Sequence, residues 1–350
     1  MHPGIPLNDL GELILGQAIE KRDFIAPANK LRVSVLDHPM LHMETQNGAI
    51  TAEINDHALR QLATYGEIPA RYLEKLESAP ELLERNLNHW LTESAEPRMV
   101  RLLANKEESV MRAFLSSRYR PLDNIDLAQR CIPRLKAIGA EIKSCALTET
   151  RFYLQAVTER ITREVKVGDR VQAGIVISNS EVGSSSLRVE PMVYRLVCSN
   201  GMVVGTSLRK FHVGRDSKSE DEFIHEIFTD QTKALMDEAF WAKVGDIIDA
   251  VFDEARFEQV VRRMSDATKT RVGDLPQDVV EVTASAFGLN KDEQEAMMRH
   301  LFEGGDLSLW GVVNAVTRTA TDVKSYDRAV ELERIGGQIL GLKPSAFSKN

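Results

Sequence analysis

The spacing of apolar residues changes twice along the chain and divides it into three stretches. In residues 1–97, an alternating strand pattern over 30–36 and a hairpin pattern over 39–54 precede segments with helical spacing. From 98 to 215 the period is mostly two, and from 216 to 350 it is helical again. The pattern predicts an α+β protein, with a central antiparallel sheet of hairpins between a mixed N-terminal segment and an all-helical C-terminal unit.

The central stretch contains the densest strand pattern of the chain. Five alternating segments between residues 140 and 213 are separated by turn residues, among them Gly168-Asp169, Gly183-Ser184 and Asn200-Gly201. Their connections are too short for helical crossovers, which indicates an antiparallel meander. Asn200-Gly201 has the residue preference of a tight hairpin turn, and we expect the turn to form there.

The last third carries helix signals and charged caps. Residues 221–264 have the spacing of one long amphipathic helix, which we expect to break near Gly245. Asn290 and Glu293 have the spacing of a capping box before an apolar helix that Gly304-Gly305 ends. We therefore predict three domains, over residues 1–97, 98–215 and 216–350.

Charge is distributed unevenly over these three stretches. The whole chain has 44 Lys+Arg and 52 Asp+Glu, a formal net charge of −8. Residues 112–215 nevertheless carry 17 basic against 9 acidic residues, whereas both flanks are acidic. A basic centre suits an anionic partner such as nucleic acid. The alternative is that the centre docks on the acidic flanks of the same chain.

Two polar segments of the basic centre could contact such a partner. SSRYRPLDN places Arg118 and Arg120 around Tyr119, and guanidinium groups match phosphate oxygens while an aromatic ring stacks on a base. NSEVGSSS, from Asn179 to Ser186, is either a plain hairpin loop or a nest of backbone N–H groups that could hold an anion. Packing of the Tyr119 ring in the core would explain an aromatic residue at this position equally well.

The segment SLRKFHVGR combines basic residues with an aromatic residue and contains no acid, as nucleic-acid-binding stripes do. The neighbouring strands add two more arginines. The predicted nucleic-acid-binding residues are Arg118, Tyr119, Arg120, Arg188, Arg195, Arg209, Lys210, His212 and Arg215.

Several functional classes find no support in the sequence. A phosphate-binding loop, a dinucleotide-binding glycine motif, GxSxG and HExxH are all absent, so we expect no cofactor and no bound metal, and we favour a protein without enzyme activity. The three cysteines are too few and too scattered for a disulfide framework or a zinc site. The N-terminal residues lack the features of a signal peptide and no apolar run is long enough to span a membrane, so we expect a cytoplasmic protein.

Three long blocks resemble a known family. The runs MRAFLSSRYRPLDN, VKVGDRVQAGIVISNSEVGSSSLRVEPMVYRLVCSNGM and LWGVVNAVTRTATDVKSYDRAVELE are similar to the family catalogued as domain of unknown function 932, and NDHALRQLATYGEIPARYL is similar to its N-terminal segment. The resemblance covers most of residues 50–340. The family occurs on phages, prophages and plasmids, which implies a role in the biology of mobile DNA. It implies no catalytic residues.

Three functions remain open at this stage. The first is a nucleic-acid-binding protein of a mobile element that binds single-stranded DNA as a homo-oligomer and promotes annealing in recombination. The second is a non-enzymatic interaction protein that counters a host defence or regulates transfer, for which the acidic flanks would suit a basic partner. The third is a metal-dependent nuclease, whose carboxylates the fold would have to bring together.

Overall fold

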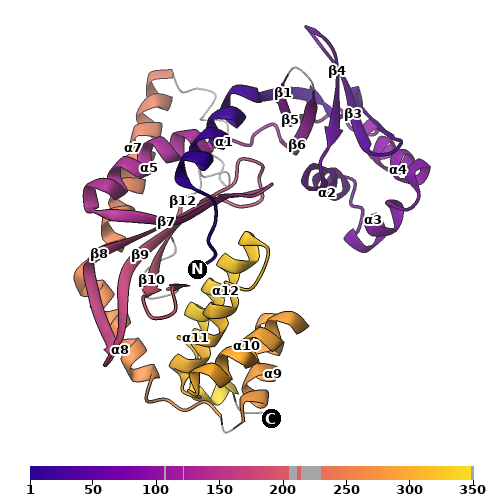
Figure 1. Ribbon diagram of the computed structural model, residues 1–350. Coiled ribbons are helices and arrows are strands. Elements are labelled where there is room, and N and C mark those ends of the chain that lie inside the picture. Colours follow the sequence, from indigo (N-terminus) through magenta and orange to yellow (C-terminus); the bar gives the residue numbers. More distant parts are fainter. Residues whose placement is uncertain (106–107, 121, 205–210, 214–229, 274, 348–350) are drawn as a thin grey trace.

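Figure 1 shows the computed structural model of the protein, in which helices pack on each of two β-sheets. The structure describes residues 1–105, 108–120, 122–204, 211–213, 230–273 and 275–347. The predicted α+β class, with a central antiparallel sheet and a helical C-terminal region, is confirmed.

The first sheet has six strands in the order β1-β5-β6-β4-β3-β2. Neighbouring strands are antiparallel except β4 and β6, which are parallel. The strands are β1 (Lys21–Pro27), β2 (Leu31–Val35), β3 (Pro39–Thr45), β4 (Gly48–Ile54), β5 (Pro97–Ala104) and β6 (Ser109–Ser116). β5 and β6 lie within the stretch predicted as the second domain, yet they pair with N-terminal strands. The boundary after residue 97 therefore does not separate the two sheets.

Helices α2, α3 and α4 pack on this sheet through buried leucines, among them Leu62, Leu83 and Leu87. The helical spacing of these leucines is the local signal that sequence analysis detected. The N-terminal helices are α1 (Leu7–Glu20), the short 3₁₀ helix η1 (Ala28–Lys30), α2 (Asp56–Tyr65), α3 (Ala70–Leu76) and α4 (Pro80–Thr92).

The second sheet is the predicted meander, with the strand order β11-β10-β9-β8-β7 and antiparallel pairing throughout. The last strand, β12, pairs with the first residues of β10, and β11 pairs with its last residues. The strands are β7 (Ala140–Leu147), β8 (Phe152–Lys166), β9 (Asp169–Asn179), β10 (Leu187–Arg195), β11 (Asn200–Val203) and β12 (Phe211–Val213).

Helices cover both faces of the second sheet, so its strands are buried on both sides. One face packs against α1, α5, α7 and α8, and α11 and α12 contact β11 at the far edge. Tyr153 and Val176 of the opposite face pack against Tyr326 and Val330 of α12. The remaining helices are α5 (Asn124–Ile138), α7 (Asp230–Val251), α8 (Glu254–Ala267), α9 (Pro276–Phe287), α10 (Lys291–Gly304), α11 (Leu309–Thr319), α12 (Tyr326–Ile339) and the 3₁₀ helix η2 (Pro344–Phe347).

The predicted tight turn at Asn200-Gly201 is wrong, because both residues belong to strand β11. The chain instead reverses before them, with Ser199 at a positive φ of 50°. The buried Asn200 amide donates to Thr317 Oγ1 at 2.6 Å. A side chain at Gly201 would approach the Glu333 carboxylate to 3.0 Å. Tertiary contacts with α11 and α12 thus explain why Asn and Gly occupy these two positions, although no turn forms there.

The predicted break near Gly245 is also wrong, since Gly245 lies inside α7. The helix ends at Val251, and Asp253 caps α8 by accepting a hydrogen bond from the backbone N–H of Arg256 at 2.9 Å. Gly245 has a packing role, because a Cβ there would lie 3.1 Å from the Arg134 guanidinium of α5. The predicted capping box of Asn290 and Glu293 is confirmed at the start of α10.

Close packing of α12 on α11 depends on a glycine. A Cβ at Gly336 would lie only 2.3 Å from Cγ2 of Thr317. We expect Gly336→Ala to lower the free energy of unfolding by about 1–3 kcal/mol, as overpacking does. Urea denaturation measures this loss. Thr317→Ser removes only the clashing methyl group and keeps the hydroxyl that Asn200 contacts, so it should restore most of the stability of Gly336→Ala. No recovery in the double variant would show that the methyl contact is not the cause.

Candidate nucleic-acid interface

The NSEVGSSS loop between β9 and β10 is partly a buried joint between the two sheets. The Val182 carbonyl accepts hydrogen bonds from His57 Nε2 at 2.9 Å and Gln61 Nε2 at 2.8 Å, both on α2. The Tyr119 hydroxyl donates to the Ser180 carbonyl at 3.1 Å. Residues 179–182 are buried, whereas Gly183, Ser184 and the next two serines are at least partly exposed. Only the second half of the loop can therefore meet a ligand.

Beneath this joint lies a buried arginine that sequence analysis did not single out. Arg101 of β5 is 1% exposed and donates two hydrogen bonds to the Asp23 carboxylate, at 2.8 and 2.7 Å. It also contacts Asp123, before α5, at 3.2 Å and the Glu181 carbonyl at 3.1 Å. One guanidinium thus connects the first sheet with the loop of the second sheet. No local sequence signal marks Arg101, since its partners come from three distant segments.

Three arginines from different elements converge next to the exposed half of the loop, and we call them the arginine cluster: Arg151, Arg188 and Arg334. Arg151 precedes β8 and donates to Ser184 Oγ at 3.0 Å. Arg334 of α12 donates to Glu190 Oε2 through Nε and Nη2, at 2.9 and 2.6 Å. Arg188 lies on β10, two residues before Glu190. The cluster therefore combines the second sheet, the loop and α12.

Arg188 is the member of the cluster whose charge is least compensated. Among the described residues it forms no ion pair, because Glu190 is engaged by Arg334, and its Nε atom is buried without a hydrogen-bond partner. Burial and then the positive charges of Arg334 and Arg151 lower the pKa of Arg188. The Ser185 hydroxyl is likewise buried without a partner within the described chain. Such donors next to like charges favour binding of an anion.

The predicted residues Arg118, Tyr119 and Arg120 follow β6 and border the same loop. Both arginines are exposed, whereas Tyr119 is half-buried and packs near Leu115 and Val182. Burial raises the pKa of the Tyr119 hydroxyl. The SSRYRPLDN segment therefore contacts the first half of the loop, and Arg188 lies on the strand that follows its second half. Tyr119 packs inward, whereas Arg118 and Arg120 are exposed at the surface.

Arg195 does not belong to this region. It donates to both oxygens of Asp169, at 2.6 and 2.9 Å, and its guanidinium lies over the ring of Trp310, 5.9 Å from the centroid. Asp169 also accepts from Trp310 Nε1 at 2.9 Å. Arg195 therefore binds a buried carboxylate of the protein itself, in place of the predicted external anion. Arg188 and Arg195 are seven positions apart on one strand, so their side chains point to opposite faces. The odd spacing between the two arginines could have shown, from the sequence alone, that they do not share a face of the sheet.

The remaining predicted residues are only partly covered by the structure. The backbone of His212 in β12 lies opposite Arg188 in the register of β10. Arg209, Lys210 and Arg215 lie outside the described residues. The prediction for these three residues stays a prediction.

Two further findings limit what the site can be. In the described ranges, no group of three or more His, Cys, Asp or Glu side chains could hold a metal ion. None of the described helices combines the length and the apolar character needed to cross a membrane. The arginine cluster places three guanidinium groups around the second half of the loop, and guanidinium groups pair with carboxylate and phosphate oxygens.

Comparison with known families gives one match. The model of the family described as "Domain of unknown function (DUF932)" matches residues 113–335. Neither the curated proteins nor the solved structures give a match. The matched region runs from β6 to α12 and includes all three residues of the arginine cluster.

Proposed function

The chain belongs to the family described as "Domain of unknown function (DUF932)", and we propose that it binds nucleic acid, with a phosphate group held by the arginine cluster. The observation that carries this proposal is Arg188. It forms no ion pair with a described carboxylate, its buried Nε atom has no acceptor within the described chain, and the positive charges of Arg334 and Arg151 act with burial to lower its pKa. A phosphate would supply both the negative charge and the acceptor oxygens that Arg188 lacks.

The surroundings of the cluster favour an extended anion over a small one. Arg118 and Arg120 are exposed on the segment that borders the same loop, so a chain of phosphates could contact them in succession. Part of the basic excess between 112 and 215 is paired with carboxylates of the C-terminal region, as in the pairs of Arg163 with Glu254 and of Lys166 with Asp306. The attraction of such a polyanion would therefore come from the exposed arginines and from the cluster. We infer that single-stranded nucleic acid, whose backbone bends more freely than a duplex, fits this surface best.

The experiment is a titration of labelled single-stranded DNA, duplex DNA and single-stranded RNA, followed by fluorescence anisotropy at several salt concentrations. Arg188→Ala should weaken binding of the preferred strand about tenfold, the loss expected for one charged hydrogen-bonding group. It should also reduce the dependence of log affinity on log salt by about 0.7, the value for one phosphate contact in a single strand.

A matched control is available on the surface of the same molecule. Arg262 of α8 has a 75% exposed side chain and pairs only with Glu258 along its helix, among the described residues. Arg262→Ala should leave both affinity and salt dependence unchanged. If wild-type protein binds none of the three nucleic acids at low salt, the proposed function is wrong.

We extend the proposal to annealing of single-stranded DNA by homo-oligomers in the recombination of mobile elements, such as phages and plasmids, on the basis of the family resemblance. Acceleration of strand annealing together with a mass above 39.2 kDa in light scattering would support this extension. The interaction-protein hypothesis predicts a basic protein partner and no nucleic-acid binding. The nuclease hypothesis predicts strand cleavage in Mg²⁺ or Mn²⁺, for which the described residues offer no group of three or more His, Cys, Asp or Glu side chains that could hold the ion.

A further inference from the structure

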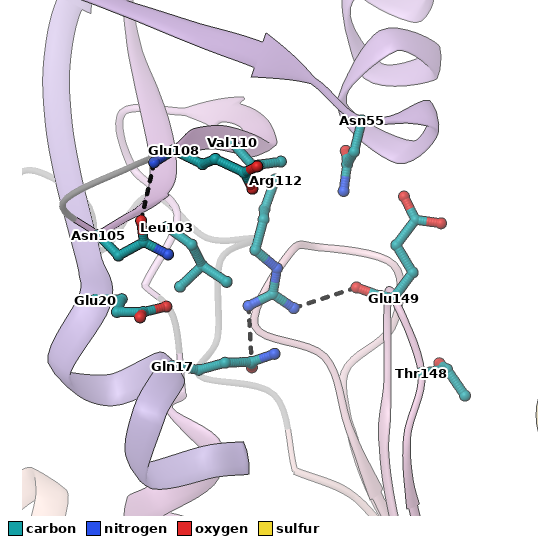
Figure 2. Close-up of a pocket in the computed structure, with 10 residues that line it drawn as sticks. All are labelled: Gln17, Glu20, Asn55, Leu103, Asn105, Glu108, Val110, Arg112, Thr148 and Glu149. Atoms are coloured by element: carbon teal, nitrogen blue, oxygen red, sulfur yellow. Dashed lines mark hydrogen bonds between the residues drawn. The ribbon is translucent and has the colours of Figure 1, made fainter.

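A polar pocket of about 290 Å³ lies where the first sheet meets the turn between β7 and β8. Its walls come from α1, the β5–β6 hairpin, the start of α2 and the turn between β7 and β8 (Figure 2). This volume is at the lower end of the range for ligand pockets, so the guest must be small. Leu103 and Val110 supply apolar wall, and the other lining side chains are polar.

Arg112 of β6 lies at the floor of this pocket and is held in a fixed orientation. Its Nη1 donates to Gln17 Oε1 and its Nη2 to the Glu149 carbonyl, each at 3.2 Å (Figure 2). Glu181 lies 3.5 Å from Nη1 and compensates its charge. The side chain is only 7% exposed. A guanidinium plane that is immobilised in this way can serve as a stacking platform for a planar ring.

The pocket offers more hydrogen-bond acceptors than donors. Glu20, Glu108 and Glu149 line it. The Glu149 carboxylate accepts a hydrogen bond from the backbone N–H of His57 at 3.2 Å and attracts the Arg112 guanidinium, whereas Glu20 and Glu108 form no ion pair within the described chain. The Asn55 carbonyl oxygen accepts from the backbone N–H of Ala58, which leaves its amide nitrogen on the pocket side (Figure 2). Three carboxylates repel a phosphate and accept hydrogen bonds from amino groups. The carboxylates therefore favour a guest with amino donors over a phosphate.

A single turn connects the pocket with the arginine cluster. Thr148 and Glu149 line the pocket, and Arg151 of the cluster follows two residues later. The turn is closed by a hydrogen bond from the Thr148 N–H to the Arg151 carbonyl at 2.8 Å and by one from the Arg151 N–H to Thr148 Oγ1 at 3.1 Å. The turn that carries Arg151 of the cluster thus also forms one wall of the pocket.

We propose that this pocket receives one unstacked base of the strand whose phosphate the arginine cluster holds, and that it prefers bases with an exocyclic amino group. The inference rests on the proposed function. In it the base stacks on the Arg112 guanidinium, and the carboxylates of Glu20 and Glu108 accept from its amino group. Cytosine, adenine and guanine meet this requirement, whereas uracil and thymine lack the amino group.

The test compares oligodeoxycytidine with oligodeoxyuridine of equal length. These two strands share backbone, charge and ring size, and they differ in the amino donor at C4 and the protonation of N3. We expect the cytidine strand to bind about tenfold more tightly, because one good hydrogen-bonded base contact discriminates by 1–3 kcal/mol. In the variant E20Q/E108Q this ratio should fall toward one, since each glutamine adds a donor where an acceptor is needed. The remote α10 variant E295Q should keep the ratio.

The outcomes separate this inference from the proposed function. Arg188→Ala should weaken both strands equally and leave the ratio unchanged. Equal, salt-dependent binding of both strands by wild-type protein would overturn the base pocket and leave the phosphate site standing. An unaltered ratio in E20Q/E108Q, with wild-type thermal stability, would likewise overturn it. Failure of both strands to bind at low salt would refute the proposed function itself.

Discussion

Replacing Arg101 by methionine is expected to lower the free energy of unfolding by about 3 kcal/mol, because removing one partner from a buried ion pair leaves the other without compensation. Arg101 is almost fully buried and holds Asp23, Asp123 and the Glu181 carbonyl in one network. Because methionine fills a similar volume, the loss of stability reflects the broken polar network and not the creation of a cavity. Urea denaturation followed by circular dichroism gives the value.

Two comparisons make this result specific to Arg101. Arg262→Met, on the exposed side of α8, should change the free energy of unfolding by less than about 0.5 kcal/mol. The double variant R101M/D23N should recover part of the loss, since the uncompensated Asp23 carboxylate is then also removed. A stability of R101M equal to that of wild type would mean that the joint between the sheets does not depend on this guanidinium.

Replacing Glu333 by glutamine is expected to stabilise the protein at neutral pH, and the gain should grow with pH. Glu333 of α12 is 1% exposed, accepts a hydrogen bond from Gln155 Nε2 at 2.6 Å, and its Oε1 atom has no partner in the described chain. Burial raises the pKa of this carboxyl group above its usual value of 4.5, and the amino group of Met1 and the Arg334 guanidinium only partly oppose that rise.

The sign of the pH dependence follows from proton binding. Above pH 4.5 the unfolded chain releases the Glu333 proton, whereas the folded chain retains it up to the raised pKa. The stability that Glu333 contributes is therefore complete below pH 4.5 and is lost as pH rises through the folded pKa. Within that window the wild type should lose about 1.4 kcal/mol per pH unit relative to E333Q.

Chemical denaturation of both proteins between pH 4 and 8 measures this difference. E295Q on the exposed side of α10 provides the control, and its stability should run parallel to that of the wild type over the same range. A constant difference between E333Q and wild type at all pH values would show that Glu333 ionises alike in the folded and unfolded states.

Local patterns were sufficient for much of the architecture. The alternating segments between residues 140 and 204 formed the meander, and Asn290 with Glu293 formed the predicted capping box. These features depend on neighbours within a few positions, which a sequence displays directly. The pair Asn200-Gly201 has the same kind of local signal, yet contacts with Thr317 and Glu333 decided its place in a strand.

The α+β class, most strands and helices, and the basic character of the central stretch could all be predicted without coordinates, because period, caps and charge are properties of adjacent residues. Which charges are compensated depended on the packing of distant segments. This packing paired Arg195 with Asp169 and buried Arg101 among Asp23 and Asp123, whereas it left Arg188 beside two other guanidinium groups. Compensation of a charge depends on distances between residues far apart in the chain, and these distances exist only once the sheets and helices have packed.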